Sequence, residues 1–205
     1  MELNRRRFLG ALAVGATGLA LTRPAFAPPA FAAVRSGETP TLLPDAMAAL
    51  QSHAGRIAER DVIGIVDFSS PSKAIRFDIV DVVGGRILSR HLVAHGSGSD
   101  PANSGWAQRF SNIPGSNASS AGSFLTDRLY VGKHGRSRRL IGLDADNSRA
   151  LERNIVIHGA SYVNADMAEN AGRIGRSQGC FAVSTGEIGE VLERLGPGRL
   201  LYAAR

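Results

Sequence analysis

The sequence predicts a mostly β fold with a few helices, arranged as an antiparallel β-sandwich or meander. Strand-like apolar runs recur from about residue 60 to the end of the chain, and glycine- and proline-rich stretches separate them. The apolar fraction of 43% is that of a globular protein, and 205 residues leave room for one domain and a leader. The chain contains no internal repeat and no second core pattern, so one packed domain is expected.

Residues 1–32 are predicted to be an export signal. Three arginines at 5–7 precede the uncharged apolar run 8–21, which is too short to cross a bilayer comfortably, and a small-residue cleavage site ends at Ala32. Residues 4–10 resemble a twin-arginine signal, which implies the twin-arginine export machinery as a partner. An ordinary secretory signal and an uncleaved anchor are the alternatives. Each interpretation places the domain outside the cytoplasm, in the periplasm or cell envelope, and we expect no membrane span in the mature form.

The charge of the mature chain indicates no nucleic-acid partner. Of the 24 basic and 18 acidic residues, four and one lie within residues 1–32, which leaves 20 and 17. The remaining basic residues are scattered rather than gathered on one element.

Residues 33–59 are predicted to be a linker followed by an N-terminal helix. Pro44 opens a pattern in which apolar residues recur at helical spacing and would face the core: Met47, Leu50, Ala54 and Ile57.

The main folded domain is expected over residues 60–205, beginning with a meander. Residues 62–68 and 74–83 form two strand-like runs, and two glycines at 84–85 turn the chain into a third run at 86–88. Residues 96–123 are rich in Gly, Ser, Asn and Pro, and so long a loop indicates a functional cover.

The second half of the chain repeats this pattern and ends on a helix and a strand. Strands are expected at 124–131, 138–143 and 154–158, with a short helix at 147–153. Residues 184–187 resemble a capping box before a helix that stops at 196–198, and a last strand covers 199–203.

Cys180 is the most informative residue because it is the only cysteine, and an exported chain with one cysteine forms no intramolecular disulfide. It is either a small buried apolar residue or a nucleophile. His158 ends a predicted strand 22 residues earlier and is followed by Gly159. An imidazole brought close by folding can take the thiol proton, and backbone N–H groups at Gly179 and Cys180 are candidates for an oxyanion site.

These residues resemble the murein L,D-transpeptidase catalytic domain, whose signature is His-Gly, a spacer, and Ser/Thr-His-Gly-Cys. The matching runs are 155–159 and 177–180, and the likeness extends over about residues 60–184, including 67–72, 93–96, 110–112, 115–116, 119–122 and 132–135. The sequence departs from the signature at Gln178, where better-known members have histidine, and at Phe181-Ala182.

The resemblance implies roles for these residues and a reaction. Cys180 would be the nucleophile, His158 the base and later the acid, residues 178–180 the oxyanion site, and Ser177 would shape the turn. The enzyme would attack a peptidoglycan stem tetrapeptide, release D-Ala and pass the thioester to an amine, without a cofactor. Hydrolysis by the same residues, as in an L,D-carboxypeptidase, is one alternative. A non-catalytic wall-binding module is another, and Gln178 favours it.

Further candidates surround this pair. Residues that could contact substrate are Arg176, Gly159, His95 and His134, and those that could line a groove are Trp106, Tyr162 and Arg173. His91 and His95 have the i, i+4 spacing of a zinc pair, but the glutamate of H-E-x-x-H is missing, so no metal is predicted.

Overall fold

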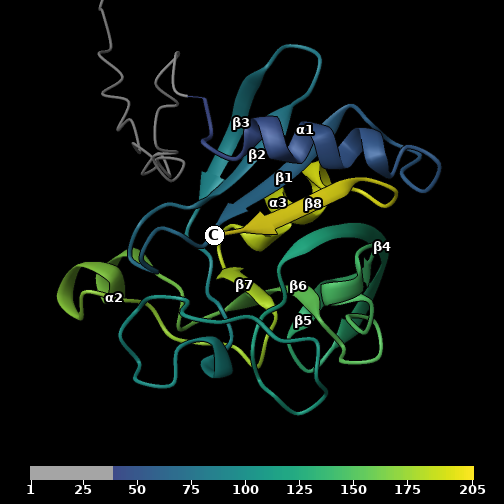
Figure 1. Cartoon of the computed structure of the whole chain (residues 1–205). Helices are drawn as coiled ribbons and strands as arrows, with labels where there is room; N and C mark the ends of the chain where they lie inside the picture. Colours follow the sequence, from purple (N-terminus) through teal and green to yellow (C-terminus); the bar gives the residue numbers. More distant parts are fainter. Residues whose placement is uncertain (1–38) are drawn as a thin grey trace, which may run out of the picture. The chain divides into compact units, whose positions relative to one another are not determined.

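The computed structural model describes residues 39–205, so the predicted export signal lies outside the described residues. Its helices and strands follow in order (Figure 1): α1 (Leu43–Ser52), β1 (Val62–Asp67), β2 (Phe77–Asp81), β3 (Arg86–His91), β4 (Gly122–Gly132), β5 (Gly135–Gly142), β6 (Val156–Ala160), α2 (Ala165–Asn170), β7 (Phe181–Ser184), α3 (Ile188–Arg194) and β8 (Leu200–Ala204). Short 3₁₀ turns cover Ser97–Ser99 and Ala145–Asn147. Within residues 39–205, no helix has the length and apolar character needed to cross a membrane.

The predicted mostly β class is confirmed, and the eight strands form one mixed sheet in the order β3-β2-β1-β8-β4-β5-β6-β7. The sheet is not wholly antiparallel, because β1 pairs in parallel with β8 and β6 pairs in parallel with β7. Parallel neighbours need a long crossover, and α2 lies in the crossover between β6 and β7. An isolated bridge from Ala94 to Ala182 joins the segment after β3 to β7, so the chain that leaves one edge of the sheet contacts the strand at its other edge.

The main core lies on the face of the sheet that α3 covers. Four phenylalanines from distant parts of the chain meet there with no exposure: Phe68, Phe77, Phe124 and Phe181. Val191 and Leu195 of α3 complete this cluster. The close packing explains Gly64, since a Cβ at this position would lie 2.8 Å from the side chains of Leu195 and Leu201.

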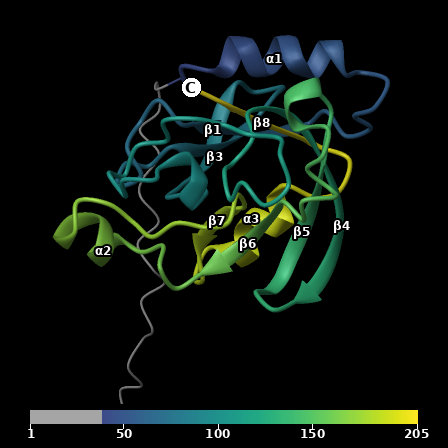
Figure 2. The same cartoon turned by 60° about the horizontal axis from the view of Figure 1, so that its bottom comes forward.

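A second core lies between α1 and the opposite face of β1, β2, β3 and β8 (Figure 2). Leu50 of α1 is 2% exposed and packs with Ile63, Ile65 and Val80, which is worth roughly 2 kcal/mol for a fully buried side chain. The predicted stripe is wrong at Met47, which is 37% exposed, while Ala46 is buried in its place. The helix ends at Ser52, so Ile57 reaches the same core from the coil that follows.

Three smaller features differ from the prediction. Helix α2, which Asn164 caps, was not predicted, because it has six residues and buries only Ala168. The capping box at 184–187 is absent, since the Ser184 hydroxyl accepts from the Gly186 N–H and Glu187 occupies the N-cap without a side-chain bond. The helix expected at 147–153 is a series of turns after the 3₁₀ turn at Ala145–Asn147.

Candidate active site

Cys180 and His158 project from the same face of two neighbouring strands. The parallel pairing of β6 with β7 sets Ile157 opposite Phe181 and His158 opposite Ala182, and Cys180 directly precedes β7. Ile157 and Phe181 point into the main core, so the alternate residues His158, Ala182 and Cys180 point to the other face. The Cys180 Sγ lies 3.5 Å from the carbonyl oxygen of Asn154, and within residues 39–205 no hydrogen bond joins it to His158.

The His158 ring is held in one orientation by its own strand. The side chain is 1% exposed, and Nδ1 lies 2.9 Å from the Gly159 carbonyl oxygen. A carbonyl accepts only, so Nδ1 carries the proton and the lone pair of the neutral ring is on Nε2. Burial lowers the pKa of His158, and the nearby His134 and Lys133 lower it further against this hydrogen bond. The ring is therefore suited to accept a proton at Nε2.

Cys180 is prepared as a neutral thiol. Burial raises its pKa, while the Val156 N–H and the charges of Lys133 and Arg153 act in the opposite direction. With the pKa of His158 lowered as well, the neutral pair is favoured over a preformed thiolate and imidazolium. This arrangement suits attack in which the imidazole removes the thiol proton as the sulfur bonds to its target.

The turn that carries Cys180 is closed by Ser177 and depends on Gly179. The Ser177 hydroxyl accepts from the Gly179 N–H at 3.1 Å and donates to the Cys180 carbonyl at 2.7 Å. Gly179 has φ +115, and a Cβ there would lie 2.7 Å from the Ala118 carbonyl oxygen. The Gly179 N–H is already engaged, whereas those of Gln178 and Cys180 have no acceptor in the described part of the chain. The Gln178 side chain is exposed.

The long segment 96–123, called the cover below, lies against this turn, and its functional role stays a prediction. The Ser119 hydroxyl accepts from the Gly96 N–H at 3.0 Å and donates to the Gly179 carbonyl at 3.1 Å. The Ser97 N–H donates to the Ser177 carbonyl at 2.8 Å, and the Ser177 N–H donates to the His95 carbonyl at 2.9 Å. The cover thus fixes the cysteine turn on both sides.

Arg153 fastens the far part of the cover and was missed by the sequence analysis. Its guanidinium donates to four acceptors between residues 111 and 120: the Ser111 and Ala118 carbonyls and the Ser116 and Ser120 hydroxyls. Burial lowers its pKa, and the Cys180 thiolate acts in the opposite direction. Arginine in a turn reads as a solvated charge, so the sequence carried no sign of this role.

His95 lies in a buried polar network and does not face solvent. It is 0% exposed, with Nδ1 2.8 Å from the Arg76 guanidinium and Nε2 3.5 Å from the Asp100 carboxylate. Burial and the Arg76 charge lower the pKa of His95 to about 4, and burial lowers the pKa of Arg76 to about 9. Arg176 donates to the Asp100 carbonyl. His95 is therefore enclosed and is not the free substrate contact that the sequence suggested, whereas Arg176 is half-buried and its contact with substrate stays a prediction.

His134 does lie at the site. It stands in the turn between β4 and β5, and its ring stacks on His158 with centroids 4.1 Å apart and an interplanar angle of 20°. Lys133 is exposed in the same turn. Tyr162 also lies near the thiol, since burial and the Cys180 charge raise its pKa to about 12. The Gly159 carbonyl bonds to the His158 ring. Gly159 leaves no open space for substrate, because a Cβ at this position would lie 3.1 Å from Ile188.

Other predicted contacts lie outside this cluster. Trp106 is 49% exposed, and its neighbour Gly105 packs against Arg173. His91 pairs with Ser89 at 2.9 Å and lies 3.4 Å from Glu187, apart from the network of His95. No group of three or more His, Cys, Asp or Glu residues within 39–205 is arranged to hold a metal.

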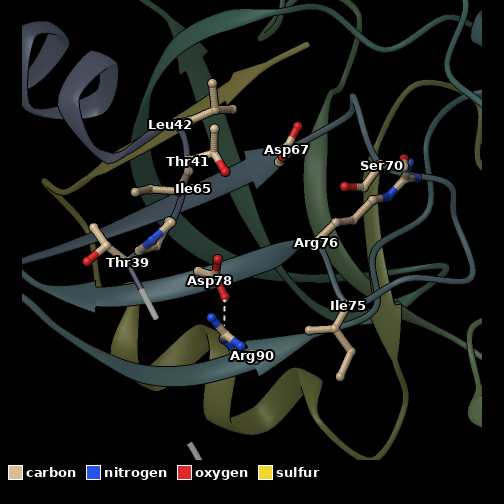
Figure 3. A pocket seen from close by; sticks show the side chains of 11 residues that line it. Thr39, Thr41, Leu42, Ile65, Asp67, Ser70, Ile75, Arg76, Asp78 and Arg90 are labelled. Carbon is tan, nitrogen blue, oxygen red and sulfur yellow. Dashed lines mark hydrogen bonds and ion pairs between the residues drawn. The ribbon is translucent and has the colours of Figure 1, made fainter. Parts of the chain in front are cut away.

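A polar pocket of about 260 Å³ lies elsewhere, beside the segment that leads into α1 (Figure 3). Asp67, Asp78, Arg76 and Arg90 line it with both signs of charge, and Asp78 pairs with Arg90 at 3.1 Å. Neither Cys180 nor His158 lines this pocket. Thr39, the first described residue, forms part of its wall.

Comparison with known proteins identifies the family. The sequence matches the L,D-transpeptidase catalytic domain family over residues 35–204. Similar solved structures include an L,D-transpeptidase from Mycobacterium smegmatis, with 12% identity and a TM-score of 0.44 over 71% of this chain and 59% of that one. Another is from Xylanimonas cellulosilytica, with 15% identity and a TM-score of 0.43 over 78% and 70% of the two chains. A third is L,D-transpeptidase 3 from Mycobacterium tuberculosis in complex with a faropenem-derived adduct, with 10% identity and a TM-score of 0.45 over 71% and 60%.

No curated protein matches the sequence significantly. The chain spans 59% of the first two L,D-transpeptidase chains that it resembles. The family match covers most of this chain, because residues 35–204 are 170 of its 205 residues. This chain therefore belongs to the L,D-transpeptidase catalytic domain family.

Proposed function

We propose that this protein is an exported peptidoglycan L,D-transpeptidase in which Cys180 is the nucleophile and His158 the general base. One observation carries the assignment of the pair. The β6–β7 register projects both side chains from one face, and the Gly159 carbonyl leaves the His158 Nε2 free to accept a proton. Membership of the L,D-transpeptidase family supports the substrate, a stem tetrapeptide of peptidoglycan.

The first half-reaction forms a thioester. As the Cys180 sulfur attacks the carbonyl between the L-centre of the diamino acid and D-Ala, its proton passes to the His158 Nε2. The N–H groups of Cys180 and Gln178, which have no acceptor among the described residues, stabilise the negative oxygen of the tetrahedral intermediate. His158 then protonates the leaving amine, the carbon–nitrogen bond breaks, and D-Ala departs. The thiol need not bond to His158 beforehand, since such bonds often tighten only when substrate binds.

The second half-reaction decides between transfer and hydrolysis. A side-chain amine from another stem attacks the thioester, His158 takes its proton, and the Cys180 thiol is restored. Water in place of the amine would make the protein an L,D-carboxypeptidase with the same residues. Cys180 and His158 need no cofactor for either reaction. Gln178 lies outside the pair that moves protons, so its presence does not by itself favour a silent wall-binding module.

Export and the domain limits belong to the same proposal. Residues 1–32 would be removed after passage through the twin-arginine machinery, and residues 33–59 would precede a catalytic domain at 60–205. The packing of α1 on the sheet supports a role for residues 43–52 in stabilising that domain. Changing Arg5 and Arg6 to lysine should block export to the cell envelope. Unchanged export of that variant would exclude the twin-arginine route.

The test of the chemistry is intact mass of the full chain after exposure to a tetrapeptide stem and, separately, to a carbapenem. The wild type should gain one adduct, Cys180→Ala none, and His158→Ala an adduct formed roughly 10²-fold or more slowly. Circular dichroism of each variant checks that the fold is kept. Products from muropeptide tetrapeptides then separate cross-linked from trimmed stems. A folded wild type that binds sacculi but forms no adduct with either reagent would overturn the proposal in favour of a wall-binding module.

A further inference from the structure

We infer that His134 is a positioning residue of the active site, which keeps His158 in its neutral, proton-accepting form at mildly acidic pH. The inference rests on the proposed role of His158 as the base. It starts from the stacking of the two rings, with centroids 4.1 Å apart and planes 20° from parallel. His134 makes no hydrogen bond to His158. It would therefore act on the base through its charge and by shielding the His158 ring from water.

The strand pairing places His134 on His158. The hairpin of β4 and β5 is paired to its end, where Gly132 faces Gly135, so Lys133 and His134 form the turn. Gly135 has φ +73, a conformation that glycine adopts freely and that closes this tight turn. Three residues after His134, Ser137 lies opposite His158 in the β5–β6 pairing. The hairpin end therefore stands directly beside the catalytic strand.

The two rings compete for one proton, and their exposure decides which takes it. Two imidazolium charges at this separation repel each other, so the pair titrates in two steps that belong to both rings. His134 is exposed, whereas His158 is 1% exposed and loses more hydration when it becomes charged. As the pH falls, the first proton goes to His134. The resulting charge then opposes protonation of His158.

The surrounding charges do not cancel this effect. Lys133, in the same turn, lowers the pKa of both rings, and burial also lowers both. On the Cys180 side the neighbours are Arg153, whose guanidinium binds the cover, and Tyr162, which is neutral at these pH values. Among residues 39–205, no carboxylate forms an ion pair with His134 or His158. The Gly159 carbonyl is the one contact that raises the pKa of His158.

The consequence is a site that keeps its base in mild acid. A lone buried histidine would lose its accepting form as the pH falls through its pKa, and thioester formation would decline in step. With His134 protonated first, that decline is moved to lower pH. The charge of His134 acts across rings 4.1 Å apart and lowers the pKa of His158, so removing this charge should raise that pKa.

The test is the rate of Cys180 acylation by a carbapenem between pH 5 and 8, measured on the full chain. His134→Phe keeps a ring on His158 without its charge, and the acidic limb should move to higher pH. The ratio of the rate at pH 5.5 to the rate at pH 8 should then fall severalfold compared with that of the wild type. His134→Lys keeps a positive charge, so its acidic limb should stay at or below that of the wild type. His53→Gln, a change at the distant pair with Asp144, is the control and should leave the limb in place.

A second measurement reads the coupling without any reaction. The chain has five histidines, so NMR titration of labelled imidazoles can follow His158 in the wild type and in His134→Phe. The pKa of His158 should rise in the variant. Equal acidic limbs together with an equal pKa of His158 in both proteins would overturn the inference and leave the stacking as packing alone. If the wild type forms no adduct at any pH, the proposed function fails, while the titration still decides whether the rings are coupled.

Discussion

Two buried histidines in this protein differ in the charged groups that surround their rings. His95 and His158 are 0% and 1% exposed, and burial lowers the pKa of both. The His95 ring lies between Arg76, at 2.8 Å, and Asp100, at 3.5 Å, so each nitrogen faces a partner. The His158 ring has one nitrogen on the Gly159 carbonyl, and within residues 39–205 its other nitrogen has no hydrogen bond. Burial is common to both, and a ring nitrogen with neither a hydrogen bond nor an ion pair among residues 39–205 distinguishes His158, the proposed base.

The two sides of the site, formed by the cover and by the β4–β5 hairpin, also differ in how their side chains are bonded. On the cover side, Ser119 and Arg153 bind backbone groups of distant segments. On the hairpin side, Lys133 and His134 are exposed beside His158. We conclude that the cover fixes the shape of the cysteine turn and that the hairpin controls the charge around it. Variants on the cover side should therefore lower stability and activity together, whereas variants on the hairpin side should change pH dependence.

The largest effect is expected for Gly179→Ala. Its φ of +115 is unfavourable for alanine, and the new Cβ would lie 2.7 Å from the Ala118 carbonyl, which is backbone and cannot move aside cheaply. The free energy of unfolding should fall by about 4 kcal/mol, the sum of backbone strain and overpacking. Acylation of Cys180 should fall roughly 10²-fold or more because the turn is displaced. Urea denaturation and intact-mass kinetics measure the two effects.

Gly115→Ala is the matched control for this change. Gly115 also has positive φ, +75, but no atom lies within 4 Å of its added Cβ. Its variant should lose about 1 kcal/mol from the backbone alone and keep its acylation rate. Equal losses in the two variants would mean that contact with the cover does not constrain the cysteine turn.

A smaller effect is expected from the His95 network as the pH changes. The pKa of His95 is about 4 in the folded chain against 6.5 for the free side chain. Between these values the unfolded chain binds the proton and the folded chain does not, so stability falls as the pH falls from about 6.5 to 4. The full loss is about 3 kcal/mol. Urea denaturation from pH 7.5 to 4.5 should show this slope, and His95→Gln should reduce it.

His158 contributes to the slope in the same direction, since its pKa is lowered too. For this reason the comparison is between the wild type and His95→Gln rather than with a calculated curve. His95→Gln should be less stable at pH 7.5 because the flexible amide replaces a ring that faces Arg76 and Asp100 at the same time. A slope equal to that of the wild type would show that His95 is not held neutral by its network.

The sequence predicted those parts of the fold that depend on residues close together in the chain. Alternating apolar residues and the two glycines at 84–85 gave the strands and hairpin of β1 to β3. The parallel pairings were not predicted, because β8 pairs with a strand more than 130 residues away and nothing in its own pattern names that partner. β7 was missed since its four residues are too few to show a period.

The same limit applies to the site. Cys180, His158 and Gly179 stood out because residue type and immediate neighbours suffice to suggest their chemistry. Arg153 binds acceptors 33 to 42 residues away, and only the folded chain reveals that contact. His95 was misjudged for a related reason: a histidine beside a glycine reads as a loop residue, whereas Arg76, on a different segment, buries it.

Ser119→Ala should have a moderate effect, because it removes one bridge without adding atoms. The hydroxyl joins the Gly96 N–H to the Gly179 carbonyl, and both lose a buried partner. We expect a loss of about 2 kcal/mol and a fall in acylation smaller than that of Gly179→Ala. Ser52→Ala, at an exposed hydroxyl that donates to the Ala48 carbonyl within α1, is the control and should be nearly neutral. A neutral Ser119→Ala would show that water replaces the bridge.

The smallest effect is expected from Glu152→Gln, next in sequence to the arginine that fastens the cover. Glu152 pairs with Arg149 at 2.9 Å, but their side chains are 57% and 50% exposed. Water and salt screen such a pair, so the loss should be below about 0.5 kcal/mol and should vanish in 1 M salt. Arg153→Gln, one position away, should cost several times more, because four acceptors in the cover lose their donor. Equal costs for the two variants, measured by urea denaturation at low and high salt, would mean that charge alone stabilises this turn and that the bonding of the cover does not.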